Sequence, residues 1–396
     1  MTHKESAMRQ DVSFSAVMAG FLAVLVSYAG PMVLVFQAAQ AANVPLDITV
    51  TWVWAISLGA AITSIGLSWF TKIPVVTAWS APGTALLITL FPELGLAEMA
   101  GAYITAAVLI LLIGISGYFD KLMALIPRGV AAGMMAGILF QFGTQAFGVV
   151  KQAPLLMWLM LAVFLLTKKW LPRYSMAIVF AVGLMVVFAL GQLDLSAVEL
   201  HITQPVWISP EWSLAATLSL ALPLALVSLT GQFLPGMSIL QLSGYKISAR
   251  PIIVVTALVS IAVAGFGGIT IVLAAITATL CVGVDAHADP DKRYIAGMSN
   301  GVFYLLGAVF AGSIVTLFTV LPQALVVILA GFALIGAIGA NIAGAIQDTD
   351  NRDAAVVSFL ATASGMTFLG LGAAFWGVVI GMMTAWLLKP KTAKIY

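Results

Sequence analysis

The residues best suited to binding a ligand form a short break in an otherwise apolar stretch, Ser80-Ala81-Pro82-Gly83-Thr84. A β-branched, extended run precedes the break, and an apolar segment to Phe91 follows it. Pro82 suits the first turn of a helix and Ser80 suits its N-cap, so we expect a helix to begin near Ala81. The first turn of a helix has unpaired N–H groups and about half a positive charge, which attract anions. The break therefore predicts an anion site.

The helix that follows this break is too short to cross a membrane. Up to Phe91 it covers about half of a ~30 Å hydrocarbon core at ~1.5 Å per residue. Non-helical backbone occurs at membrane depth only where protein or a water-filled cavity surrounds it. We therefore expect residues 75–91 to be a short strand and a half-helix beside a binding site. A proline-kinked ordinary span is the alternative.

A second interrupted segment lies at residues 264–283, where glycines precede an apolar run. We predict that its half-helix begins at Gly268, Ile269 and Thr270 and that its N-terminus faces the first one. Two such N-termini at mid-membrane form an anion site without a basic side chain.

Polar or aromatic side chains beside other helix breakers are further candidates for substrate contact. They are Tyr28, near Pro31, and Gln232 and Phe233, near Pro235. Plain packing is the alternative for all three. The helices that carry these residues must cross a membrane, because 62% of the chain is hydrophobic and only 8% is charged.

The hydropathy pattern predicts an all-α polytopic membrane protein with about fourteen spans. The expected ranges are 12–40, 48–70, 75–91, 98–119, 127–149, 153–170, 175–192, 213–240, 252–264, 268–284, 295–318, 322–345, 354–370 and 371–388. With both termini cytoplasmic, every Lys and Arg except Lys151 falls on the cytoplasmic side, as the positive-inside rule requires. No Asp, Glu, Lys or Arg then lies at mid-membrane, which argues against a carrier of inorganic cations.

The chain also reads as two copies of one seven-span unit. Ile126-Pro127 and Leu321-Pro322 occupy similar contexts half a chain apart, and an odd number of spans between them inverts the second copy. We expect a tail at 1–11, repeats at 12–200 and 213–388, and an external loop at 201–212. Spans 3 and 10 correspond, each as a short strand plus a half-helix.

Four segments identify a family resemblance: TAWSAPGTALL, LIPRGVAAGMMAGILFQFG, the LPG of ALPLALVSLTGQFLPG, and DAAVVSFLATASGMTFLGLGAAFWG. They resemble the benzoate/proton symporter family (BenE), over nearly the whole chain. The resemblance implies the fold of uracil/xanthine and sulfate-type transporters, with a core domain (12–119 and 213–318) moving like an elevator against a gate domain (127–192 and 322–388). It also implies a homodimer through the gate domain.

The resemblance implies import of benzoate or a similar aromatic carboxylate together with a proton, across the inner membrane. Nucleobase transporters of that fold carry glutamates where we align Ile269 and the neighbourhood of Gly231-Gln232, so their absence argues against a nucleobase. A nucleobase or small inorganic anion transporter, or a membrane enzyme, are the alternatives.

Other chemistry finds little support in the sequence. The three histidines, His3, His201 and His287, lie outside the expected spans, and the acids around His287 are expected to be solvated loop residues. We therefore expect no metal, no cofactor, no catalytic residue and no nucleic-acid partner.

Overall fold

The computed structural model describes residues 11–90, 94–119, 121, 127–172, 174–192, 202–275, 277–366, 368–369 and 373–388. The expected N-terminal tail apart from Asp11, the end of the third expected span at Phe91, and residues 370–372 between the last two expected spans lie outside the described residues.

The described chain is a succession of helices with one short ribbon of two strands. Its first half contains α2 (Phe14–Ala29), α3 (Met32–Ala41), α4 (Leu46–Thr71), β1 (Thr77–Trp79), α5 (Ala81–Leu90), α6 (Leu96–Ser116), α8 (Arg128–Gly148), α9 (Pro154–Trp170) and α10 (Ser175–Ala189). Its second half contains α11 (Leu214–Ala216), η3 (Thr217–Ala221), α12 (Leu222–Ser228), η4 (Leu229–Phe233), α13 (Leu234–Leu242), α14 (Ala249–Ala264), β2 (Ile271–Leu273), α15 (Ala278–Val282), α16 (Tyr294–Val309), α17 (Ala311–Thr319), α18 (Gln323–Gln347), α19 (Arg352–Ala363) and α20 (Ala373–Leu388).

Several of these helices are long and apolar enough to cross a membrane. Six continuous or gently bent segments meet this condition among the described residues, and α16 with α17 form a seventh that bends by 71°. Three shorter apolar helices, α10, α14 and α20, have 15 or 16 residues. The structure therefore agrees with the expectation of a helical membrane protein.

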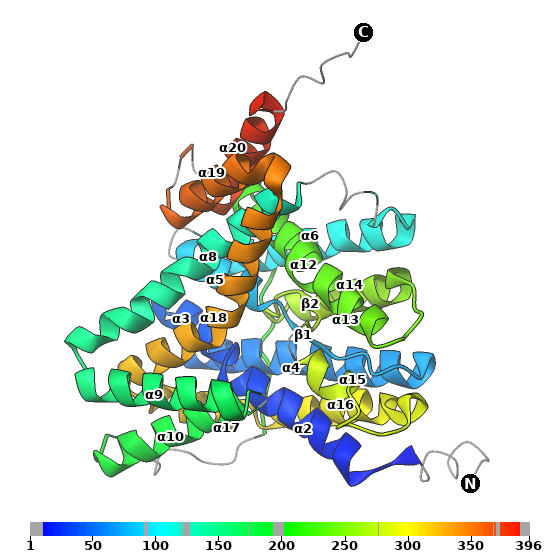
Figure 1. Cartoon of the computed structure of the whole chain (residues 1–396), viewed down its shortest axis with the longest axis vertical. Coiled ribbons are helices and arrows are strands. Elements are labelled where there is room, and N and C mark those ends of the chain that lie inside the picture. Colours follow the sequence, from blue (N-terminus) through cyan, green and yellow to red (C-terminus); the bar gives the residue numbers. More distant parts are fainter. Residues whose placement is uncertain are drawn as a thin grey trace.

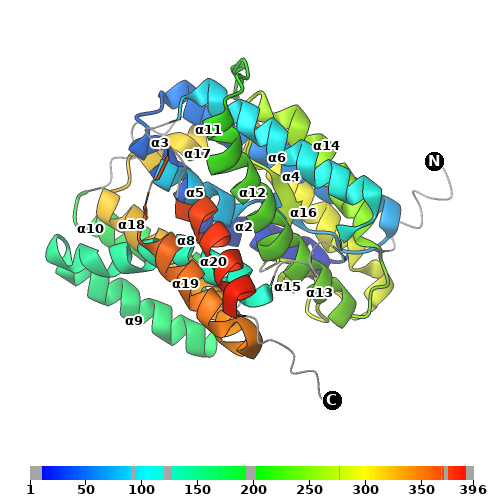
Figure 2. The same cartoon turned by 90° about the horizontal axis from the view of Figure 1, so that it is seen from above.

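The helices pack in two groups that meet along α3, α5, α12 and η3. In one group α8 packs against α18 and α19, and α19 packs against α20. In the other group α16 packs against α4 and α2, and α14 packs against α6. Figure 1 shows the ribbon of β1 and β2 within the second group, and the view in Figure 2 separates α8, α9, α18 and α19 from α4, α6, α14 and α16.

Serine side chains on neighbouring helices complete the outer edges of the ribbon. β1 and β2 are antiparallel, and each strand has one edge that no strand covers. On α4, Ser64 Oγ accepts from the N–H of Thr77 at 3.0 Å, and on α14, Ser260 Oγ accepts from the N–H of Ile271 at 2.8 Å. Since an unpaired backbone group inside a membrane costs several kcal/mol, these hydroxyls allow the strands to exist there.

Candidate functional site

The α5 N-terminus begins where the sequence predicts, and Ser80 is its cap. Ser80 Oγ accepts from the N–H of Gly83 at 3.2 Å, and the Ser80 carbonyl accepts from the N–H of Thr84 at 2.8 Å. Pro82 has no N–H. Ala81 is therefore the first-turn residue whose N–H lacks a partner among the described residues, and it is only half-buried. The helix thus offers an anion one backbone donor together with its dipole.

A cluster of three buried hydroxyls joins this helix start to two other elements. Ser228, at the end of α12, lies 3.1 Å from Thr270 Oγ1 and 3.5 Å from Ser80 Oγ. The backbone of Thr270 also pairs with Ser80, whose N–H donates to the Thr270 carbonyl at 3.0 Å. All three side chains are almost completely buried. The cluster places rotatable O–H donors beside the α5 N-terminus, and such donors serve anions well.

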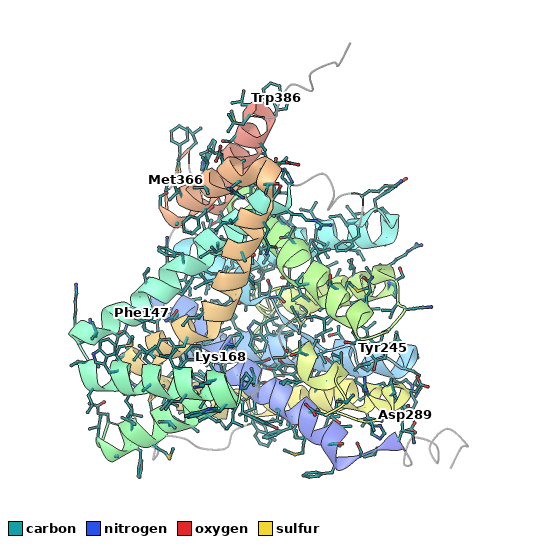
Figure 3. All side chains as sticks on the ribbon, in the orientation of Figure 1. Phe147, Lys168, Tyr245, Asp289, Met366 and Trp386 are labelled. Atoms are coloured by element: carbon teal, nitrogen blue, oxygen red, sulfur yellow. The ribbon has the colours of Figure 1, made fainter. Side chains whose placement is uncertain are left out.

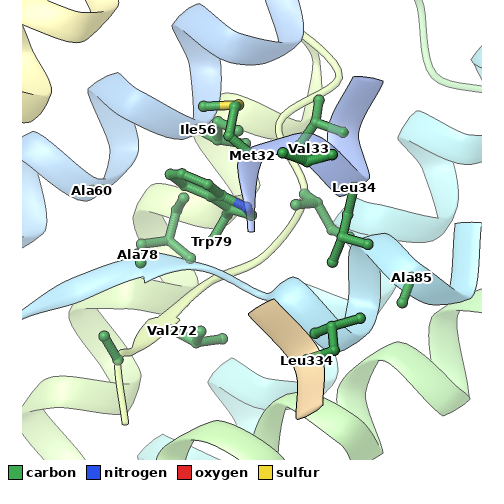
Figure 4. Packing of buried hydrophobic residues seen from close by; sticks show 14 of the residues in the cluster. Met32, Val33, Leu34, Ile56, Ala60, Ala78, Trp79, Ala85, Val272 and Leu334 are labelled. Carbon is green, nitrogen blue, oxygen red and sulfur yellow. The ribbon is translucent and has the colours of Figure 1, made fainter. Parts of the chain in front are cut away.

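A cluster of three aromatic rings surrounds the end of β1. Trp79 stacks on Tyr28 with ring centroids 6.0 Å apart, and Tyr304 meets both rings edge-on. Tyr28 Oη is 2.8 Å from Ser57 Oγ on α4. Trp79 is 2% exposed, and its indole N–H has no hydrogen-bond partner among the described residues. Figure 4 shows this indole lying beside Met32 and Ile56, near the start of α3. Tyr28, on α2, therefore contacts the ribbon through its ring stack with Trp79.

The second half-helix does not begin where the sequence predicts. Gly268, Ile269 and Thr270 lie before β2, and the helix α15 starts only at Ala278 and has five residues. The glycines form a turn instead, since Gly267 has φ +71°, and the β-branched residues after it pair with β1 as a strand. The expectation of a helix N-terminus at residues 268–270 is therefore wrong.

The ribbon register identifies the residues that occupy the equivalent place in the second copy. Ala78 pairs with Val272, so the local twofold relates Ser80, two residues later, to Ala274, and Ala81 to Ala275. Ala275 is half-buried, as Ala81 is. Ile269 instead is 3% exposed and lines, with Thr84 and Tyr103, a cavity of about 10 Å³.

Gln232 and Phe233 differ in how deeply they are buried. Both belong to the π-helical turn η4, but Gln232 is half-buried whereas Phe233 is completely buried. The sequence reasoning missed Ser228, four residues before Gln232. A signal for it was present, because Leu226-Val227-Ser228 repeats the Leu25-Val26-Ser27 of the first span and a glycine follows each serine three residues later.

The site carries no buried acid within the described part of the chain. Arg293 is the charged side chain that is buried there, and it donates to the carbonyls of Val282 at 2.8 Å and His287 at 2.8 Å, near the end of α15. The described residues contain no group of His, Cys, Asp and Glu suited to a metal ion. Figure 3 shows Asp289, from the loop after α15, at the edge of the molecule, where it is exposed.

Comparison with solved structures identifies the fold. The transmembrane domain of the cyanobacterial bicarbonate transporter BicA matches with a TM-score of 0.57 at 14% identity, over 95% of this chain and 97% of that one. SLC26A9 matches with a TM-score of 0.64 at 14% identity, over 94% of this chain and 64% of that one. The fold is that of a membrane transporter.

Sequence comparison then identifies the family. A profile described as "Benzoate membrane transport protein" (BenE) matches residues 10–387, so the chain belongs to the BenE family of membrane transport proteins and is not an enzyme. A benzoate membrane transport protein of Acinetobacter baylyi is 57% identical over 99% of this chain and 100% of its own length. The inner membrane protein YdcO of Escherichia coli is 40% identical over 92% of this chain and 93% of its own length.

Proposed function

We propose that this protein is a secondary active importer of benzoate or a similar aromatic monocarboxylate. The observation that carries the proposal is the α5 N-terminus, where the N–H of Ala81 has no partner and no acid is buried among the residues that the structure describes. A carboxylate is attracted by this N–H and by the helix dipole. The nearby ring cluster of Tyr28, Trp79 and Tyr304 suits an aromatic ligand, since edge-on and stacked ring pairs stabilise by about 0.5–1.5 kcal/mol.

The carboxylate would sit between Ala81 and Ala275. The register relates these two residues, and both are half-buried with small side chains. Gly268, Ile269 and Thr270, which lie before β2, then stand behind the carboxylate and not against it. Thr270 keeps an indirect role through Ser228, while Gly268 and Ile269 support the packing behind the ribbon.

We infer a topology of fourteen spans in two inverted repeats, with both termini cytoplasmic. The antiparallel register of β1 and β2 supports an inverted relation between spans 3 and 10. The packing of α4, α6, α14 and α16 apart from α8, α18 and α19 supports a core domain that moves against a gate domain. A homodimer through the gate domain and elevator-like movement remain part of this proposal.

The proton, on this proposal, enters on the substrate as benzoic acid. The described part of the chain buries no carboxylate that could carry it, and Asp285 and His287 lie in a largely solvated loop. Gln232 can donate to a carboxylate and accept from its protonated form. Gln232→Ala should therefore weaken benzoate binding and leave the remaining transport proton-coupled. Loss of coupling in an Asp285→Asn/His287→Ala variant would assign the proton to the loop instead.

The test is uptake of radiolabelled benzoate into proteoliposomes with an imposed pH gradient, acid outside. We expect accumulation that salicylate inhibits and that uracil and sulfate leave unchanged. Strong inhibition by uracil or sulfate, or uptake that the pH gradient does not drive, would contradict the proposal.

A further inference from the structure

A large cavity lies where η4 and α13 face α8 and α18. Its volume is about 490 Å³, within the range of roughly 300–1,000 Å³ that is usual for sites of small organic ligands. One wall comes from η4 and α13, and the other from α8 and α18. The lining residues are Arg128, Ala131, Ala132, Met135, Thr230, Leu234, Ala340, Asn341, Gly344, Gln347 and Asp348. Thr230, on η4, lies two residues from Ser228 and two from Gln232.

Among the described residues that line the cavity, Arg128 is the basic side chain. Arg128 is exposed at the first position of α8, and it has no ion-pair or hydrogen-bond partner among the described residues. The acid in the same cavity, Asp348, is already engaged. Its Oδ2 accepts from the N–H of Gly129 at 2.9 Å, and both its oxygens accept from the side-chain amide of Asn351, at 3.0 and 3.2 Å. Asp348 therefore caps α8, and Arg128 keeps its positive charge toward the cavity.

The rest of the lining is suited to an aromatic ring. Ala131, Ala132, Met135, Leu234 and Ala340 form an apolar surface beside the guanidinium. Met135 also packs against Gly231 in η4, the turn that contains Gln232. An aromatic carboxylate would place its ring on this apolar surface and its carboxylate against Arg128. Guanidinium and carboxylate form strong, often bidentate hydrogen bonds.

We propose that this cavity is a second binding site for the aromatic carboxylate, occupied as substrate leaves toward the cytoplasm. The inference rests on the proposed function for its ligand and for the assignment of this face to the cytoplasm. Arg128 binds the carboxylate, and the alanine and methionine surface of α8 binds the ring. Binding here draws the substrate from the neutral site near Ala81 toward the open end of the cavity.

The protein offers an internal control of similar size. A second depression, of about 480 Å³, is lined by Gln241, Gly244, Tyr245, Lys246, Ile247 and Ser248. It also carries a cation, Lys246, but a single loop and helix end form it, without the apolar wall of α8. A site that needs only positive charge would appear in both places.

The experiment measures protection of an introduced cysteine. The native Cys281 is completely buried, so Ala132→Cys, on the half-buried wall of the cavity, provides an accessible thiol in purified protein. Its labelling rate by the neutral reagent N-ethylmaleimide is measured against benzoate concentration, with benzamide as the uncharged analogue. We expect benzoate and not benzamide to slow labelling. Adding Arg128→Gln should raise the half-protecting benzoate concentration roughly tenfold, while Arg128→Lys raises it less.

Three outcomes would overturn the inference. They are no protection by benzoate, equal protection with Arg128→Gln, and equal protection of a Gln241→Cys thiol in the control depression, where Lys246 is kept. Benzoate uptake is measured in parallel on the wild-type protein, which keeps Cys281 and carries no introduced cysteine. Uptake without protection would remove only the second site, whereas protection without uptake would leave the second site and remove the proposed transport function.

Discussion

Variants of the hydrogen bond between Ser228 and Thr270 can separate the contribution of these hydroxyls to stability from their contribution to substrate binding. Thr270 is 1% exposed, and its hydroxyl bonds to Ser228 at 3.1 Å. Ser228→Ala removes this bond and leaves the Thr270 hydroxyl buried without it, which should cost about 2 kcal/mol. Thr270→Val keeps the shape and leaves Ser228 only its long contact of 3.5 Å with Ser80 Oγ, which should cost about 1 kcal/mol.

The double variant is expected to be more stable than Ser228→Ala alone. Replacing both partners with apolar groups of similar shape leaves no unsatisfied hydroxyl in the pair, so the coupling energy should be about 1–2 kcal/mol. Stability can be followed with a thiol-reactive dye, because buried Cys281 becomes accessible on unfolding. Destabilisation equal to the sum of the single variants would show that the two hydroxyls are not coupled.

Benzoate binding by the same double variant tests the role of the cluster. If the hydroxyls of Ser228 and Thr270 bind the carboxylate or orient Ser80, the recovered protein should still bind benzoate at least tenfold more weakly, since a hydrogen bond to a charged group contributes about 1.5–3 kcal/mol. Wild-type affinity in this variant would refute that role and leave the cluster as packing between α12 and the ribbon.

Three further predictions concern single positions. In Gly83→Ala the new Cβ would overlap Leu224, so benzoate uptake should fall, and adding Leu224→Ala should restore part of it; no restoration would refute the steric cause. Trp79→Phe keeps a ring against Tyr28 but loses the buried N–H, and should raise the KM for benzoate about fivefold; an unchanged KM would exclude the indole N–H from binding. Ile269→Glu should prevent folding, because this side chain is 3% exposed, whereas Ala275→Glu should fold and lose benzoate binding by charge repulsion, as size-exclusion chromatography and a binding assay would show.

The sequence was sufficient for the first half of the site. Pro82 and Ser80 act within one turn of their own helix, so local rules placed the α5 N-terminus at Ala81. Composition was likewise sufficient for a helical membrane protein with its acids outside the expected spans, because the free energy of transferring charge into a bilayer depends on residue type before it depends on fold.

The sequence was insufficient for the second half of the site. The glycines at 265–268 fit either a helix start or a turn, and Ser260 together with β1 decides for a turn followed by a strand. Ser260 lies only 11 residues before Ile271, but β1 lies almost 200 positions earlier in the chain, so no local pattern contains the strand partner.

Composition and local spacing thus determined that the chain crosses the membrane, where its first half-helix begins and which charges it excludes from the interior. Only the tertiary structure decided which hydroxyls gather at that helix and which cation is left unpaired. Ser228 reaches Ser80 and Thr270 because α12 packs against α5, and Asp348, which follows α18, caps α8 and leaves Arg128 without an ion pair among the described residues. Hydrogen bonds between distant segments depend on how helices pack, and packing depends on the shape of both partners at once.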